Sequence, residues 1–299
     1  MKLGLQVPYF SWPDAPASIG PTFARIAKDA EDAGMSSLWV MDHFFQIEMI
    51  GPPELEMLEG YTALAFAAAH TSTIELGTLV TGVTYRHPGI LMKTVTTLDV
   101  LSGGRAWLGI GAAWNEEEHS GLGVPYPRLA DRFEQLEETL KIAHTMRSGD
   151  DSPQMGPHYQ LSRPLNSPAP MGRLPIMVGG SGETKTLRMV AQYADACNIF
   201  DFGPGGVKAK YEVLEGHCAA LGRDPAEIER TVITRMALST DGAPLEESGE
   251  QTLTVPQAVD KLGALAEIGT QTVMFGLPNA HEQEVFELVA DVAAQVNDI

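Results

Sequence analysis

A glycine-rich turn at residues 179–183, Gly-Gly-Ser-Gly-Glu, lies between the apolar run 175–178 and the helix-like segment 184–191. A strand that breaks into glycines and then opens a helix directs several free backbone N–H groups at one point, and the helix dipole attracts an anion there. The pattern therefore predicts a phosphate-binding turn built from the backbone of Gly179, Gly180, Ser181 and Gly182. The same glycines also suit a plain strand-to-helix turn, and the local sequence does not separate these two interpretations.

A second chemical pair, Asp42 and His43, directly follows the apolar run 37–41. An imidazole next to a carboxylate suits proton transfer, because imidazole protonation changes near neutral pH. Asp42 and His43 are therefore the candidate catalytic residues. An Asp-His pair at the end of a strand also serves as a cap or as a buried structural pair, so its role depends on the surrounding residues.

Several other kinds of chemistry lack the residues that they need. The eight histidines are never spaced as His-x-His or His-x-x-x-His, which argues against the paired metals of many hydrolytic barrels. The sequence also lacks a Gly-x-Ser-x-Gly elbow and a Walker loop. Cys197 and Cys218 match no zinc or redox motif, which predicts two reduced thiols. We therefore expect no metal site and no covalent hydrolysis.

Composition and charge narrow the class of partner. The chain has 299 residues, of which 44% are hydrophobic and 20% charged, and its formal net charge is −19. Such a charge repels nucleic acid and anionic membrane surfaces, and no apolar stretch approaches the ~20 residues of a membrane span. The first residues also lack the apolar run of a signal peptide. We expect a cytoplasmic protein that acts on a small molecule, an anionic one included.

Short aliphatic runs alternate with amphipathic helical segments along the chain. The eight expected strands are residues 2–7, 37–41, 75–80, 105–110, 175–178, 196–200, 230–238 and 272–277. Gly34, Gly222 and Gly269 stand where helices should end, and Thr254 with Gln257 resembles a capping box. Eight such units with wholly apolar strands predict the α/β class and a (β/α)8 TIM barrel, formed as a single domain by residues 1–299.

A doubly wound open sheet is the alternative fold. The segment 109–114, Gly-Ile-Gly-Ala-Ala-Trp, is similar to a dinucleotide-binding fingerprint, but Trp114 replaces its third glycine and no strand ending in an acid follows at the required distance. In a barrel, the chemistry lies at the carboxyl ends of the strands. We therefore expect the proline-rich segment 149–174, which leads from a helix into a strand, to lie at the opposite end, and the segment 239–253 to form a lid over the site.

Four ordered motifs carry a family resemblance. They are residues 42–44 (Asp-His-Phe), 84–88 (Thr-Tyr-Arg-His-Pro), 108–118 (Leu-Gly-Ile-Gly-Ala-Ala-Trp-Asn-Glu-Glu-Glu) and 179–183. Together they resemble the luciferase-like monooxygenase superfamily, and within it the coenzyme F420-dependent oxidoreductases of actinobacteria. The resemblance runs along nearly the whole chain and implies a luciferase-like TIM barrel with a flavin or deazaflavin at its C-terminal mouth.

The resemblance also implies roles for individual residues. It places Asp42 and His43 near the reacting ring, and a cis peptide bond at Leu79–Val80 against that ring. The implied cofactor contacts are Asp42, His43, Leu79, Val80, Thr81, Ala112, Asn115, Gly179, Gly180, Ser181 and Gly182. The implied reaction is hydride transfer between coenzyme F420 and a small organic substrate, by a protein that forms a homodimer.

One departure from the family bears on the substrate. The deazaflavin sugar-phosphate dehydrogenases of this superfamily have a catalytic glutamate where this chain has the segment 112–114, Ala-Ala-Trp. Sugar phosphates are therefore poor candidates, and an apolar wall at Trp114 favours a hydrophobic or conjugated substrate. An FMN-dependent monooxygenase and a non-catalytic flavin-binding protein remain the alternatives.

Overall fold

The computed structural model describes residues 1–245 and 249–297. The main sheet contains β1 (Lys2–Val7), β2 (Ser37–Val40), β3 (Glu75–Thr78), β4 (Thr81–Gly82), β5 (Ala106–Gly111), β8 (Ile176–Gly179), β9 (Ala196–Phe200), β10 (Glu229–Arg235) and β13 (Thr272–Gly276). The helices are α1 (Ile19–Asp32), α2 (Gly60–His70), α3 (Pro88–Ser102), α4 (Glu116–Leu122), α5 (Leu129–Arg147), α6 (Thr186–Tyr193), α7 (Gly203–Leu221), α8 (Val255–Ala266) and α9 (Val285–Val296). Two strand pairs lie outside this sheet, β6 (Gln154–Met155) with β7 (Gln160–Leu161) and β11 (Ala237–Leu238) with β12 (Thr252–Leu253).

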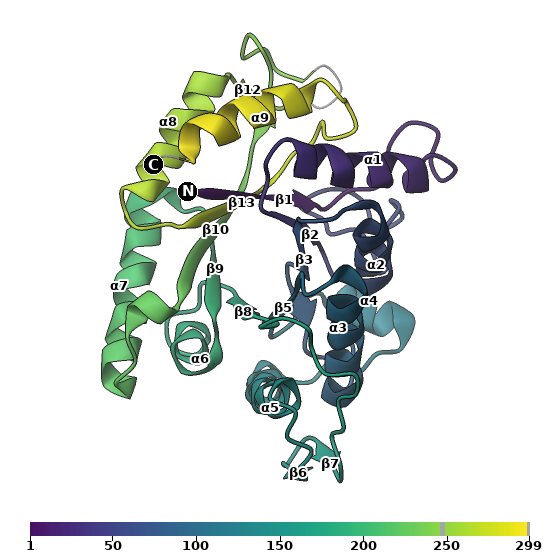
Figure 1. Ribbon diagram of the computed structural model, residues 1–299, viewed down its shortest axis with the longest axis vertical. Coiled ribbons are helices and arrows are strands. Elements are labelled where there is room, and N and C mark those ends of the chain that lie inside the picture. Colours follow the sequence, from purple (N-terminus) through teal and green to yellow (C-terminus); the bar gives the residue numbers. More distant parts are fainter. Residues whose placement is uncertain (246–248, 298–299) are drawn as a thin grey trace.

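The main sheet closes on itself. Within the described residues its order is β3-β2-β1-β13-β10-β9-β8-β5-β4, every pairing is parallel, and β3 also pairs with β5. Because β4 continues the line of β3, these strands occupy eight positions around a barrel. The helices surround the strands (Figure 1). The predicted (β/α)8 barrel is therefore confirmed.

Apolar sequence explains why the strands lie inside. All six residues of β5 are buried, as are all five of β13. Neither strand therefore shows the alternation of buried and exposed residues that is typical of a strand with one face in solvent. The barrel interior is filled by one cluster of buried side chains, Trp39, Trp107, Met177, Ala196 and Met274. Leu79, Val80 and Ile233 pack against this cluster.

Three glycines leave room for Val80 at the mouth of the barrel. The third expected strand is interrupted after Thr78 by the Leu79–Val80 peptide bond, which is cis, as the resemblance implied. A Cβ atom at Gly179 would lie 2.8 Å from Val80 Cγ1, and one at Gly111 would lie 3.0 Å from Val80 Cγ2. A Cβ atom at Gly109 would meet the carbonyl oxygen of Thr78 at 2.0 Å. The glycines of β5 and β8 thus accommodate the bulge at the end of β3.

Helix ends agree with the sequence pattern. Gly34, Gly222 and Gly269 have φ angles of 82°, 68° and 92°, the left-handed region in which a glycine avoids the Cβ clash. Thr254 and Gln257 form the predicted capping box at the start of α8, where the Thr254 N–H donates to Gln257 Oε1 at 2.9 Å.

The proline-rich segment 149–174 was wrongly expected to stay at the far end of the barrel. Its β6–β7 hairpin packs outside α5, where the Tyr159 N–H donates to Glu138 at 2.9 Å (Figure 1). The Tyr159 ring contacts His87, the residue that caps the N-terminus of α3. Since α3 follows β4, that contact lies toward the carboxyl ends of the strands. The segment therefore returns along the outside of the barrel, a path set by side-chain contacts that local pattern does not reveal.

The lid candidate 239–253 is partly described, since residues 246–248 lie outside the described residues. Its ends are held together by the β11–β12 pairing and by a hydrogen bond of 2.6 Å between the hydroxyls of Ser239 and Thr252. Arg235 Nε donates to Glu250 at 2.8 Å. A lid function for this segment stays a prediction.

Glu31 on α1 fixes the turn that leads into β3. Its Oε1 accepts hydrogen bonds from the N–H groups of Ser72, Thr73 and Ile74 at 2.8, 2.6 and 3.1 Å. Burial raises the pKa of Glu31, but these hydrogen bonds outweigh it and lower the pKa to about 2. The stabilisation by Glu31 is therefore fully present above the ordinary glutamate pKa and is lost as the pH falls toward 2.

Replacing Glu31 by alanine should lower the free energy of unfolding at neutral pH by about 1–3 kcal/mol, because three backbone N–H groups lose the charged acceptor that they share. Urea unfolding at a series of pH values tests this, and the difference from the parent should shrink as the pH falls below about 4. Asp32→Ala is the matched control, since its pair with Lys28 is exposed to solvent, where an ion pair contributes little to stability. Equal effects of the two substitutions would contradict the assignment.

Within the described residues, no helix is long and apolar enough to cross a membrane.

Candidate functional site

The predicted site residues gather at one end of the barrel. They follow β2, β3, β5 and β8 or lie at the carboxyl ends of these strands, and in the closed sheet these strands, with β4 continuing β3, are consecutive. Because all the strands are parallel, their carboxyl ends share one rim. The four loops that the sequence singled out therefore lie side by side.

The glycine turn begins where β8 ends, at Gly179. Gly180 has a φ of 118°, and its N–H donates to the carbonyl of Asn198 at 3.0 Å. The N–H groups of the next residues, Ser181, Gly182 and Glu183, have no acceptor within the described part of the chain. Helix α6 begins at Thr186, slightly later than the sequence pattern suggested, and its Leu187 N–H donates to the carbonyl of Gly182 in the turn at 3.0 Å. The turn can thus hold an anion such as a phosphate.

The turn also leaves little room for side chains. A Cβ atom at Gly182 would lie 2.9 Å from Thr186 Oγ1, and one at Gly179 would meet Val80. The Ser181 hydroxyl accepts the Phe200 N–H at 3.3 Å, which joins the turn to the end of β9. The turn therefore requires glycine at positions 179 and 182 to keep this shape, with its free N–H groups exposed to an anion.

Asp42 lies beneath the rim, paired with an arginine. Its carboxylate is 2% exposed and accepts two hydrogen bonds from Arg86, Nη1 to Oδ2 at 2.6 Å and Nη2 to Oδ1 at 2.9 Å. Arg86 also pairs with Glu59 and stacks over the Tyr61 ring at 4.8 Å. Burial raises the pKa of Asp42 to about 6, and Arg86 limits the rise. Both oxygens of Asp42 are thus engaged by a protein partner.

His43 has a different partner. Its Nδ1 lies 2.7 Å from Glu118 Oε1, and its side chain is 14% exposed. The Trp114 ring, itself 54% exposed, packs edge-on against the imidazole with the ring centroids 5.3 Å apart. His43 Nε2 makes no hydrogen bond to any described residue. This nitrogen is therefore available to a bound molecule.

Glu118 is fully buried on α4 and holds the loop after β2 as well as His43. Its Oε2 accepts the N–H groups of Phe44 and Phe45 at 2.8 and 3.3 Å, and the Tyr85 hydroxyl donates to Oε1. Burial raises the pKa of Glu118, but the hydrogen bonds from His43 and Tyr85 outweigh it, so its pKa lies below the ordinary value. Glu118 is therefore a buried carboxylate in ionised form.

The remaining predicted residues differ in what they offer. Thr81 is buried, and its hydroxyl bonds to those of Tyr61 and Thr78 at 2.7 and 2.8 Å, which leaves only its backbone for a ligand. Asn115 caps α4 by accepting the Glu117 N–H at 3.2 Å. Ala112 is half-buried just beyond β5. Leu79 and Val80 lie over the interior cluster.

Sequence reasoning missed the partners of the catalytic pair. Glu118, Arg86 and Tyr85 stand in motifs that supported the resemblance, yet none was given a role. One local signal was present: Asn115 followed by three glutamates is typical of a helix N-terminus, and it marks α4. Nothing local, however, indicates that Glu118 reaches His43.

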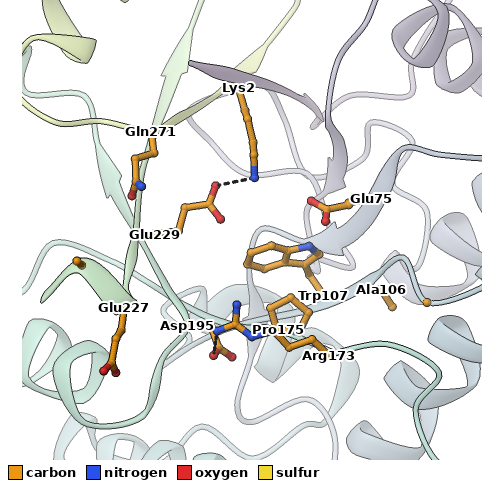
Figure 2. A pocket seen from close by; sticks show the side chains of 12 residues that line it. Lys2, Glu75, Ala106, Trp107, Arg173, Pro175, Asp195, Glu227, Glu229 and Gln271 are labelled. Atoms are coloured by element: carbon orange, nitrogen blue, oxygen red, sulfur yellow. Dashed lines mark hydrogen bonds and ion pairs between the residues drawn. The ribbon is translucent and has the colours of Figure 1, made fainter. Parts of the chain in front are cut away.

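The opposite end of the barrel also carries a cavity, of about 420 Å³ (Figure 2). It is lined by residues at the amino ends of the strands, among them Lys2, Glu75, Trp107 and Glu229. Figure 2 shows the ion pair between Lys2 and Glu229, whose atoms lie 3.6 Å apart, among the residues that line this cavity. Because this end carries none of the predicted residues, we assign the chemistry to the other end.

In the described parts of the chain, no three or more His, Cys, Asp or Glu side chains are grouped so that they could hold a metal ion.

Two relatives of known name are similar to this chain in sequence. The F420-dependent glucose-6-phosphate dehydrogenase of Kineococcus radiotolerans is 31% identical over 231 residues, covering 74% of this chain and 65% of that protein. The pyrimidine monooxygenase RutA of Agrobacterium fabrum is 30% identical over 181 residues, 59% of this chain and 49% of that protein.

A solved structure gives the same fold. That of an F420-dependent secondary alcohol dehydrogenase superposes with a TM-score of 0.79 at 16% identity, covering 97% of this chain and 98% of that one. The sequence profile of the luciferase-like monooxygenases matches residues 1–291. The barrel, its shared rim and this match lead to one conclusion: the chain belongs to the luciferase-like monooxygenase family.

Proposed function

We propose that this enzyme transfers a hydride between coenzyme F420 and a small organic substrate. The observation that carries the proposal is the position of His43 Nε2, which has no partner among the described residues and shares a rim with the free N–H groups of the glycine turn. A proton-exchanging group and an anion site on one rim are what a reaction with a phosphate-bearing redox cofactor requires. The names of the Kineococcus relative and of the alcohol dehydrogenase support F420.

The residues present fit such a cofactor. The N–H groups of Ser181, Gly182 and Glu183, at the start of α6, would hold its phosphate, and Val80 would lie under its ring. When bound, coenzyme F420 supplies a carbon that accepts or donates a hydride. His43 then takes up the substrate proton at Nε2 when the substrate is oxidised, and returns it in the reverse direction.

The substrate we propose is hydrophobic or conjugated. Trp114 presents an exposed indole next to His43, and the alanines at 112 and 113 put no carboxylate beside it. A sugar phosphate would find no polar partner on this wall, whereas an apolar ring or chain would bury surface against it.

A second candidate is a monooxygenase that uses reduced FMN. The identity to RutA favours it, and the same glycine turn would serve the FMN phosphate. For the organisation of the molecule we propose a cytoplasmic homodimer, by analogy with the family.

Equilibrium binding to the purified protein tests the proposed function. Titrations that follow the fluorescence of F420 and of FMN should give at least about tenfold tighter binding of F420, a difference of about 1.4 kcal/mol. Tighter binding of FMN would overturn the proposal and favour the monooxygenase. Hydrophobic and conjugated compounds are then screened as substrates. The change in F420 absorbance reports which of them the enzyme turns over.

A further inference from the structure

Glu118 is the one carboxylate in the described chain that contacts the imidazole of His43. It comes from α4, 75 residues further along the chain, and is 0% exposed. Its Oε2 accepts the Phe44 and Phe45 N–H groups, and its Oε1 lies against the Tyr85 hydroxyl and His43 Nδ1.

These contacts determine where His43 carries its proton. An ionised carboxylate can only accept hydrogen bonds, so the His43 nitrogen that faces Glu118 must be the donor. Neutral His43 therefore has its hydrogen on Nδ1 and a lone pair on Nε2. That lone pair is what a proton acceptor at the rim needs, because the same ring with its hydrogen on Nε2 has no site for the substrate proton.

Backbone contacts make the arrangement directional. Oε2 faces two N–H groups that can only donate, so the atom at this position must be an acceptor. The other carboxylate position faces His43 and Tyr85, either of which can donate or accept. The backbone thus fixes which end of the side chain meets His43.

We propose that Glu118 is a positioning residue for His43, which holds the imidazole in the Nδ1–H tautomer and leaves Nε2 to exchange the proton with the substrate. The catalytic part of this inference rests on the proposed function. Its tautomer part concerns the protein alone.

The decisive variant is Glu118→Gln, which keeps the shape of the side chain. In the variant the amide oxygen must stay with the Phe44 and Phe45 N–H groups, so the amide NH2 faces His43. The NH2 group can only donate, and His43 must then accept at Nδ1 and carry its hydrogen on Nε2. Glu118→Gln should therefore invert the tautomer while it preserves the hydrogen bonds that hold the loop.

Long-range ¹H–¹⁵N correlation spectra of ¹⁵N-histidine-labelled protein report the tautomer directly. They are recorded without cofactor at about pH 9, where ordinary imidazoles are neutral, and the His43→Asn spectrum assigns the signals. We expect Nδ1–H in the parent and Nε2–H in Glu118→Gln. Tyr85→Phe is the matched control, since it removes another hydrogen bond to the same oxygen but leaves an acceptor for His43, and it should keep Nδ1–H.

Turnover provides the second measurement. With F420 and an accepted substrate, Glu118→Gln should lower kcat by about 10²-fold, the low end of what acid–base catalysis contributes, with no change in the dissociation constant of F420. Two results of the tautomer measurement would overturn the inference: neutral His43 in the parent with its hydrogen on Nε2, or neutral His43 in Glu118→Gln with its hydrogen still on Nδ1. If the variant does not fold, the parent spectrum decides alone. If no turnover with F420 is found but the tautomer inverts, the proposed function fails and the role of Glu118 in holding His43 stands.

Discussion

Turnover should fall by about 10² to 10⁴-fold when His43 is replaced by alanine, the range that a positioned acid–base group contributes. The reason is the loss of Nε2, which has no partner among the described residues and lies beside the exposed Trp114 ring. The measurement is kcat with F420 and an accepted substrate, together with the dissociation constant of F420. We expect kcat to fall and F420 binding to persist, because the free N–H groups of the glycine turn remain.

His70→Ala is the matched control. His70 is exposed in the last turn of α2, at the end of the barrel away from the rim, so its replacement should leave kcat unchanged. Equal turnover in His43→Ala and the parent would remove His43 from the chemistry. A parent protein that binds the cofactor but turns over no tested compound would favour the non-catalytic flavin-binding alternative.

Replacing Arg86 by leucine should lower the free energy of unfolding by about 3–5 kcal/mol at pH 8, because it leaves the Asp42 carboxylate buried without its partner. Asp42→Asn combined with Arg86→Leu should recover part of this loss, since the buried group is then neutral. Arg128→Leu is the control: Arg128 pairs with Asp131 on the surface, where an ion pair contributes little to stability, so this variant should unfold like the parent. Urea unfolding measures all of these variants.

The effect of Arg86→Leu should also depend on pH. In the parent, burial already raises the pKa of Asp42 to about 6, and loss of Arg86 raises it further. A carboxyl whose folded pKa is raised destabilises the protein fully above that pKa, and the cost disappears as the pH falls to the ordinary aspartate value. Relative to the parent, the deficit of Arg86→Leu should therefore be largest at pH 8 and shrink toward about pH 6, where Asp42 becomes protonated in both folded proteins. A deficit that stays constant across this range would show that Asp42 is not its source.

Much of the fold was predictable because the barrel strands are wholly apolar. Runs such as β5 and β13 are buried on both faces, and their alternation with amphipathic helices leaves few ways to cover a parallel sheet. Two expected strands were too long. The third is interrupted at Leu79–Val80, and the seventh ends at Arg235, after which β11 leaves the barrel to pair with β12. The pattern of apolar residues in the sequence does not by itself show where a strand breaks in this way.

The position of the site was predictable from the sequence, but the hydrogen-bond and ion-pair partners of its side chains were not. Asp42 and His43 could be placed at a strand end because the strand before them is clear in the sequence. Their partners could not, because Arg86 and Glu118 are distant along the chain and are brought in by β4 and α4. The two neighbours therefore have separate partners: Asp42 forms a buried ion pair with Arg86, and His43 contacts the carboxylate of Glu118 on α4.

The space around Val80 bears on how the enzyme can be redesigned. Side chains added at Gly109, Gly111 or Gly179 would collide with Val80 or with the backbone of Thr78, so mutant libraries aimed at new substrates should leave the floor of the mouth untouched. Diversity belongs instead at Trp114, whose indole projects into solvent and can be shortened without disturbing the interior.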